Sequence, residues 1–104
     1  KKSAKTIAVD TITLPAILTA YHITSCDLLK LDCEGAEYDI LFSLPKELLN
    51  TIRQIAMELH TARYFGLESD AYDPKKLVQY LENSGFRVRE VKENKMHSLI
   101  YATR

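Results

Sequence analysis

The chain has 104 residues, of which 46% are hydrophobic and 27% are charged, and its 14 basic residues balance 14 acidic ones. This length and composition are typical of one globular domain, so we expect residues 1–104 to form a single α/β domain. A neutral chain offers no overall field to attract nucleic acid or an anionic membrane. No apolar stretch approaches the roughly 20 residues that a membrane span needs. Neither nucleic acid nor a membrane is therefore an expected partner.

Cysteine usage indicates the compartment. Cys26 and Cys33 are the two cysteines of the chain, which is too few for a disulfide framework, and the chain shows no hydrophobic leader. We therefore expect a cytoplasmic protein in which both thiols stay reduced. Their simplest role is that of small apolar core residues.

The first half of the chain predicts alternating strands and helices. Residues 6–12, TIAVDTI, are rich in β-branched side chains and predict a short strand. Thr13 as N-cap and Pro15 in the first turn predict a short amphipathic helix after it. Residues 27–33, DLLKLDC, are apolar on both faces, which is typical of a parallel strand covered by helices on both sides.

The second half continues this order and ends in a hairpin. A helical stripe ends near Pro45, and residues 52–59, IRQIAMEL, alternate as a half-buried strand does. Asp73 and Gly85 are placed to cap the two ends of a further helix. FRVREV and MHSLIYAT then flank a polar stretch, KENK, and predict an antiparallel hairpin. The expected fold class is α/β, with parallel strands and a terminal antiparallel hairpin.

Two strand-end patterns resemble a known family. Lys30 to Glu37 match the sequence Lys, apolar, Asp, apolar, Glu-Gly-Ala-Glu, with Cys33 where valine is common, and Met57 to His60 match apolar, Glu, apolar, His. Together with LENSGF further on, they resemble the C-terminal half of FkbM-type S-adenosylmethionine-dependent methyltransferases. The resemblance runs from about Val9 to Arg104.

The resemblance implies a partial Rossmann-like methyltransferase sheet with S-adenosylmethionine as the cofactor. It also implies O-methylation of a small-molecule acceptor, at a hydroxyl of a sugar or natural product. The family's glycine-rich turn after its first strand is absent, because Gly35, Gly66 and Gly85 are scattered. The chain therefore resembles the C-terminal part of such an enzyme, inactive by itself. The alternative is a truncated, non-catalytic domain that associates with itself.

Asp32, Glu58 and His60 are the candidate site residues. Ligands of open α/β sheets bind outside the carboxyl ends of the strands, where all three residues are expected. Glu58 and His60 lie two apart in a strand, so their side chains share a face about 6.6 Å apart, and Asp32 follows a neighbouring strand about 4.8 Å away. The three could hold Mn²⁺ or Mg²⁺. Alternatively, His60 could act as a general base.

Structural roles compete with these functional ones. Asp32 could equally be an N-cap for the following helix, and His60 could be a surface histidine. Glu34 and Glu37 are interpreted as first-turn carboxylates that favour the helix dipole. Glu58 is the strongest candidate, because a carboxylate on a buried strand must be paired or bound to a ligand.

The missing half of the family's sheet also predicts self-association. Without that half, one edge of the strand at residues 27–33 has unpaired N–H and C=O groups, which makes it a template for pairing. Either residues 6–12 cover this edge within the chain or a second molecule does so. We expect a homodimer, since so large an apolar patch is unusual on a monomer.

Overall fold

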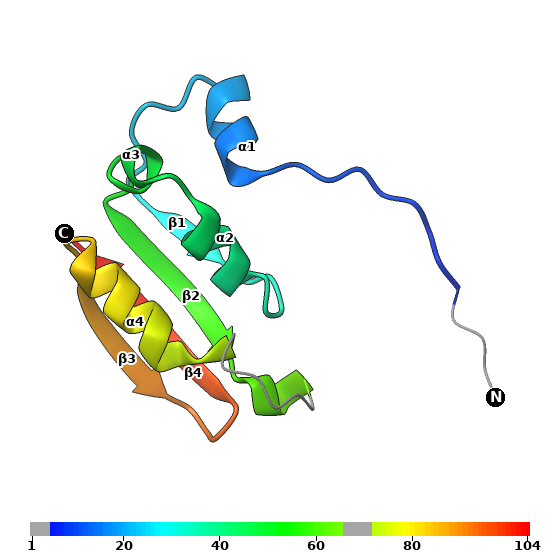
Figure 1. The fold of residues 1–104 in the computed structure, drawn as a ribbon, viewed down its shortest axis with the longest axis vertical. Helices are drawn as coiled ribbons and strands as arrows, with labels where there is room; N and C mark the ends of the chain where they lie inside the picture. Colours follow the sequence, from blue (N-terminus) through cyan, green and yellow to red (C-terminus); the bar gives the residue numbers. More distant parts are fainter. Residues whose placement is uncertain (1–4, 66–71) are drawn as a thin grey trace.

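Four strands form one mixed sheet in the computed structural model, which describes residues 5–65 and 72–104 (Figure 1). The order across the sheet is β1-β2-β4-β3, with one parallel pair, β1 with β2, and two antiparallel pairs. The strands are β1 (Leu29–Leu31), β2 (Gln54–His60), β3 (Arg87–Lys92) and β4 (His97–Thr103). The α/β class and the terminal hairpin are confirmed, but the sheet is mostly antiparallel because β4 lies between β2 and β3.

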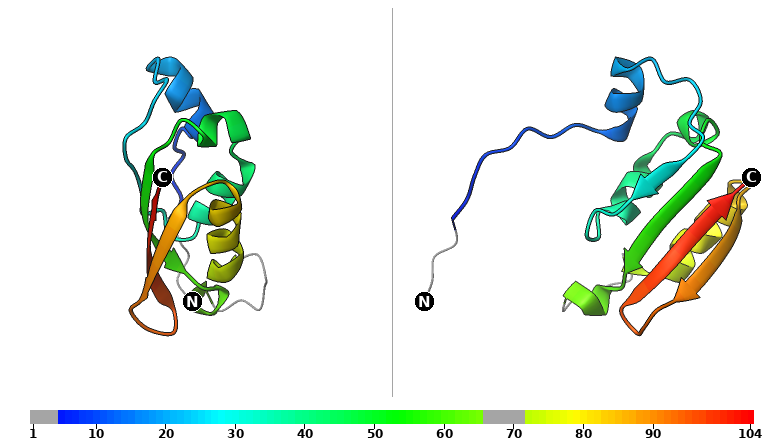
Figure 2. Two further views of the ribbon diagram at one scale, coloured as in Figure 1. Left: turned by 90° about the vertical axis from the view of Figure 1, so that its left-hand side faces the viewer. Right: turned by 180° about the vertical axis from the view of Figure 1, so that it is seen from behind.

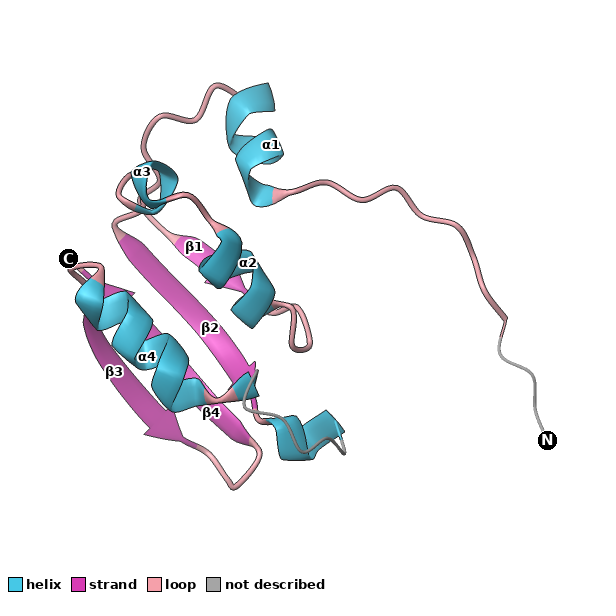
Figure 3. Ribbon diagram, viewed as in Figure 1, coloured by secondary structure: helices cyan, strands magenta, loops and turns pink. Residues whose placement is uncertain are grey.

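The helices lie where their capping residues predict. Thr13 accepts a hydrogen bond from the backbone N–H of Ala16, and Asp73 accepts one from that of Lys75. Gly85, at φ 97°, follows the last of these helices in the left-handed conformation that glycine tolerates. Figure 3 shows the helices, which are α1 (Leu14–Ala20), α2 (Glu37–Ser43), α3 (Lys46–Leu49), the 3-10 helix η1 (Ala62–Phe65) and α4 (Pro74–Asn83).

The hydrophobic core lies between one face of the sheet and the helices α2 and α4. Alternation along β2 directs Ile55, Met57 and Leu59 to this face, and each is at most 5% exposed. Leu41 of α2 and Leu77 of α4 pack against them and are fully buried. The edge-on view in Figure 2 shows both helices on the same side of the sheet.

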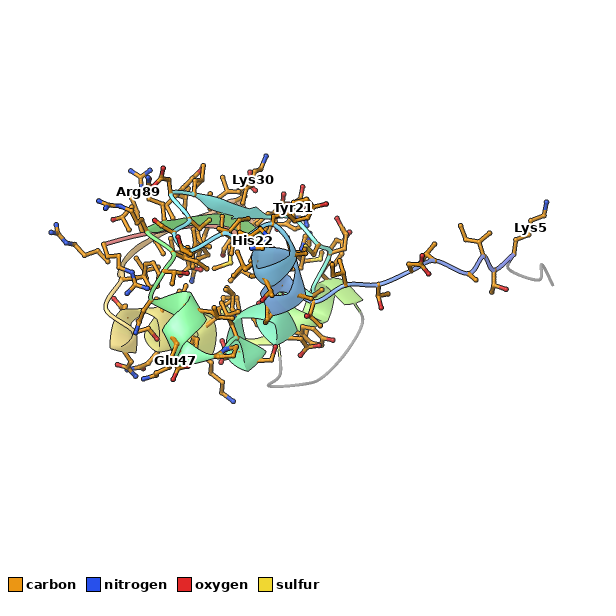
Figure 4. The ribbon with its side chains drawn as sticks, turned by 90° about the horizontal axis from the view of Figure 1, so that it is seen from above. Lys5, Tyr21, His22, Lys30, Glu47 and Arg89 are labelled. Carbon is orange, nitrogen blue, oxygen red and sulfur yellow. The ribbon has the colours of Figure 1, made fainter. Side chains whose placement is uncertain are left out.

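The opposite sheet face, which we call the open face, carries no helix among the described residues. Lys30 and Arg89 project from it, away from the side on which Glu47 lies (Figure 4). The expectation that helices cover residues 27–33 on both sides is therefore wrong for the described part of the chain. The reason is topological: the connection from β1 to β2 passes through α2 and α3, which leaves the other face without a crossover helix.

The N-terminal segment, residues 5–13, forms no strand. It runs away from the sheet (Figure 1), and Ile7 and Val9 are 84% and 70% exposed. The predicted strand at residues 6–12 is therefore wrong, and this segment does not cover the edge of β1, which was the alternative to the expected homodimer. β-Branched residues favour extended backbone, but a strand also needs a hydrogen-bonding partner. No helix among the described residues is long and apolar enough to cross a membrane.

Candidate functional site

The end of β2 is held in place by the helix that follows β1. The hydroxyl of Tyr38, in the first turn of α2, donates a hydrogen bond to the backbone carbonyl of His60 at 2.8 Å. Burial, and then the carboxylates of Asp73 and Glu37, raise the pKa of Tyr38, so the hydroxyl keeps its proton and remains a donor. The carboxyl ends of β1 and β2 are thereby fixed relative to each other.

Glu58, His60 and His97 form the polar cluster at this end of the sheet. Glu58 and His60 lie on the same face of β2, as their spacing predicts, with Oε1 of Glu58 3.7 Å from Nε2 of His60. His97 is the cross-strand partner of His60 at the start of β4. One ligating atom from each of the three side chains lies within 4.8 Å of the others. The cluster faces the open side of the sheet.

His60 is buried rather than superficial, so its interpretation as a surface histidine is wrong. It is the last residue of β2 and is 3% exposed. The ring of Tyr64, in η1, lies 4.3 Å from its ring and that of His97 lies 4.7 Å away, between centroids. The chain turns back over the strand end through η1, and this turn covers the imidazole.

Asp32 follows β1 but does not join this cluster. It is exposed, and it lines a pocket of about 260 Å³ on the open face together with Glu58, Lys30, Leu99 and Tyr101. Its alternative role as N-cap of α2 is wrong, because the N-cap position is held by Ala36 and makes no side-chain capping bond. Asp32 and Glu58 thus share a pocket, while the imidazoles lie on the other side of Glu58.

Glu37 takes the structural role that was expected, by a different route. Its carboxylate is fully buried and accepts hydrogen bonds from the backbone N–H groups of Cys33 and Gly35, the latter at 2.9 Å. The side chain at the start of α2 therefore binds the backbone of the loop between β1 and α2 and fixes its conformation. Cys33 is exposed, so its assignment to the core is wrong, and Cys26 is only partly buried.

Glu34 lies in the turn before α2 and not in the helix. Its backbone has φ 50°, a left-handed conformation that is uncommon outside glycine. Its carboxylate accepts a hydrogen bond from the hydroxyl of Tyr64 at 3.3 Å, and the negative charge raises the pKa of Tyr64. Glu34 therefore links the loop after β1 to η1. Gly66, the next glycine along the chain, lies outside the described residues.

His97 is the cluster residue that sequence reasoning missed. The hairpin was predicted, but the register that sets His97 opposite His60 depends on which strand pairs with β2. The signal in the sequence was that His97 comes directly after the hairpin turn, at the start of the last strand. The strand that ends in Glu58 and His60 lies earlier in the chain. That signal gives no register by itself.

The hydrogen bonds of Asn94 indicate which tautomer a neutral His97 adopts. Its side-chain oxygen accepts the backbone N–H groups of Met96 and His97, at 2.8 and 3.0 Å. Its NH₂ group therefore faces Nδ1 of His97, at 3.0 Å, as a donor. Because Nδ1 must accept this bond, a neutral His97 carries its proton on Nε2.

Comparison with known proteins identifies a family. The family model of the methyltransferase FkbM domain matches residues 1–88. No curated protein and no solved structure matches the chain. The mixed four-stranded sheet is compatible with part of a methyltransferase fold. Because the family match covers most of the chain, this protein belongs to the FkbM methyltransferase domain family.

Proposed function

We propose that this chain is the C-terminal part of an S-adenosylmethionine-dependent O-methyltransferase that acts on a hydroxyl of a sugar or natural product. The observation that carries the proposal is Glu58. Its side chain is 36% exposed on the open face and stands beside the buried His60. Family membership supports the methyl donor, because methyltransferases in general use S-adenosylmethionine.

The pocket beside Glu58 has the chemistry that a hydroxylated acceptor needs. Asp32, Glu58 and Lys30 offer hydrogen-bonding groups, while Leu99 and Tyr101 offer apolar and aromatic surface. S-adenosylmethionine, when bound, would supply the methyl group that the acceptor oxygen takes up. The hydroxyl proton passes to the carboxylate of Glu58, which is the exposed member of the pair and so the one that can touch the acceptor. The buried His60 positions this carboxylate.

The test is Glu58→Gln in a protein that also carries the glycine-rich half of the family's sheet. Loss of one general base lowers rates by about 10²–10⁴-fold, so kcat should fall by this factor while the affinity for S-adenosylmethionine stays unchanged. Lys30→Gln should raise KM for the acceptor with a smaller effect on kcat. A Glu58→Gln enzyme with full activity would remove Glu58 from the mechanism.

The 104-residue chain by itself should bind S-adenosylmethionine weakly and transfer no methyl group. Such cofactors are held at a glycine-rich turn, where bare backbone can approach the ligand, and Gly35, Gly66 and Gly85 are scattered along this chain. Titration calorimetry should give little heat at micromolar concentrations. Low-micromolar binding would contradict the prediction and would place the cofactor contacts in this half.

Self-association of the domain is the second candidate function, and the edge of β1 favours it. β1 has a hydrogen-bonded neighbour on one side only among the described residues. Beside this edge lies a mostly apolar pocket of about 450 Å³, whose lining includes Leu29, Leu31 and Ile40. The exposed Ile7 and Val9 of residues 5–13 have the apolar character to fill such a pocket in a second copy.

The chain should therefore be a dimer at micromolar concentration. Leu28, which precedes β1 and is 57% exposed, should be part of the contact, so Leu28→Lys should shift the light-scattering mass to that of a monomer. Val9→Lys should act in the same direction. Val91→Lys is the matched control and should stay dimeric, because Val91 lies on β3, the strand at the opposite edge of the sheet. A wild-type monomer would refute the homodimer.

A further inference from the structure

We propose that Glu58, His60 and His97 form a binding site for a first-row transition ion such as Zn²⁺. The donor atoms of the three side chains lie within 4.8 Å of one another, and the Glu58–His60 pair is already at 3.7 Å. Two ligands of a tetrahedral ion with bonds of about 2.0–2.2 Å stand about 3.4 Å apart. Side-chain rotations that shorten these separations by about 1 Å would bring the three donors onto one ion.

Two paired strands, rather than loops, supply the three donors. Glu58 and His60 are spaced by the pleat of β2, and the ladder between β2 and β4 sets His97 directly opposite His60. Tyr38 fixes the last peptide of β2 through its hydrogen bond to the carbonyl of His60. A site on rigid elements loses little conformational freedom when it binds an ion.

The donor set determines which ion fits. The three residues that the sequence suggested, two carboxylates and one imidazole, would suit Mn²⁺ or Mg²⁺. Asp32 stands outside the cluster, and His97 takes its place. Two imidazoles and one carboxylate favour Zn²⁺ and similar ions over Mg²⁺, which prefers oxygen ligands. We therefore expect Zn²⁺ to bind and Mg²⁺ not to bind.

The open face leaves room for a further ligand on the ion. Glu58 is 36% exposed and also lines the pocket that holds Asp32 and Lys30. Three protein ligands with an open fourth position are the arrangement of catalytic zinc sites. An ion there would lower the pKa of an acceptor hydroxyl, and Glu58 would then hold the ion instead of taking the proton itself. This last use depends on the proposed methyl transfer, whereas binding of the ion does not.

The hydrogen bond between Asn94 and His97 disfavours binding of an ion by His97, and changing Asn94 therefore tests the proposal. Nδ1 of His97 accepts a hydrogen bond from Asn94, so the neutral ring carries its proton on Nε2. Binding of an ion through Nε2 requires this proton to move to Nδ1 and the NH₂ group of Asn94 to turn away. An aspartate at the same position would instead accept the Nδ1 proton, as carboxylates do behind metal-bound histidines. Asn94→Asp should therefore tighten Zn²⁺ binding by about 10-fold or more.

The chain offers its own control, because His22 is the third histidine and lies after α1, outside the cluster. The experiment is NMR of the histidine ring protons during titration with zinc sulfate, in a Cys33→Ser background that removes the exposed thiol. The signals of His60 and His97 should shift and that of His22 should stay unchanged. Magnesium sulfate should move none of them.

Variants then assign the ligands. Saturating Zn²⁺ should raise Tm by about 4 °C or more in the Cys33→Ser protein. Glu58→Gln and His97→Asn should remove most of this rise, and His22→Asn should retain it. The proposal is overturned if Zn²⁺ leaves the ring signals of His60 and His97 unmoved, or if the rise survives in Glu58→Gln and His97→Asn. A weaker affinity in Asn94→Asp would overturn Nε2 of His97 as the ligand.

Discussion

Replacing Glu37 by glutamine should lower the free energy of unfolding by about 1–3 kcal/mol, since a buried N–H group that loses its acceptor costs about that much. The carboxylate of Glu37 is fully buried and accepts two backbone N–H groups, from Cys33 and Gly35. Glutamine keeps the shape but has one oxygen and one NH₂ group. One of the two backbone donors would then face another donor.

Urea denaturation followed by far-UV circular dichroism measures this loss. Glu47→Gln is the matched control, because Glu47 is exposed at the start of α3 (Figure 4) and its replacement should change stability by less than about 0.5 kcal/mol. Equal stabilities for Glu37→Gln and Glu47→Gln would show that the loop after β1 does not need the buried carboxylate.

The effect of Glu37 extends to the candidate site. The loop that it closes carries Asp32 into the open-face pocket and Glu34 toward the hydroxyl of Tyr64. Tyr38, the next residue, holds the end of β2. Glu37→Gln should therefore also weaken Zn²⁺ binding, because a displaced Glu34 would no longer hold the hydroxyl of Tyr64, whose ring covers His60. The two consecutive residues thus connect the core to the polar cluster.

Local signals predicted the elements whose stabilising contacts are close in sequence. The caps Thr13 and Asp73 make the side-chain bonds that helix N-termini need. Alternation in residues 52–59 gave the buried face of β2 correctly, and the polar stretch between residues 91 and 96 gave the hairpin. The shared face of Glu58 and His60 follows from the same period of two.

Long-range pairing could not be predicted in the same way. Residues 6–12 have the composition of a strand, yet no strand in the described part of the chain pairs with them. The register that brings His97 to His60 is set across 37 positions of chain by the β2–β4 ladder. The sequence predicted that Glu34 and Glu37 both lie in the first turn of a helix. Carboxylates have the same sequence pattern whether they lie in a first helical turn or close the loop before it.

Arg104 ties together three segments that lie far apart in the sequence. Its guanidinium donates to the backbone carbonyls of Ile52 at 2.9 Å, Ser84 at 2.8 Å and Leu49 at 2.6 Å. The same group lies 3.8 Å from the ring centroid of Phe86. Partial burial lowers the pKa of Arg104 from its ordinary value. One planar side chain therefore joins the ends of α3 and α4 to the start of β2.

Arg104→Ala should lower the free energy of unfolding by about 2–3 kcal/mol, because charged hydrogen bonds contribute about 1.5–3 kcal/mol each and water replaces part of that loss. Arg104→Lys should recover less than half, since an ammonium group cannot match a planar fork or stack on Phe86 in the same way. Arg87→Ala, at an exposed position of β3, is the control and should be nearly neutral. Chemical denaturation of the three variants measures their free energies of unfolding and so tests this order of stability. A lysine variant as stable as wild type would mean that charge alone, and not the guanidinium geometry, holds the ends of α3 and α4 to β2.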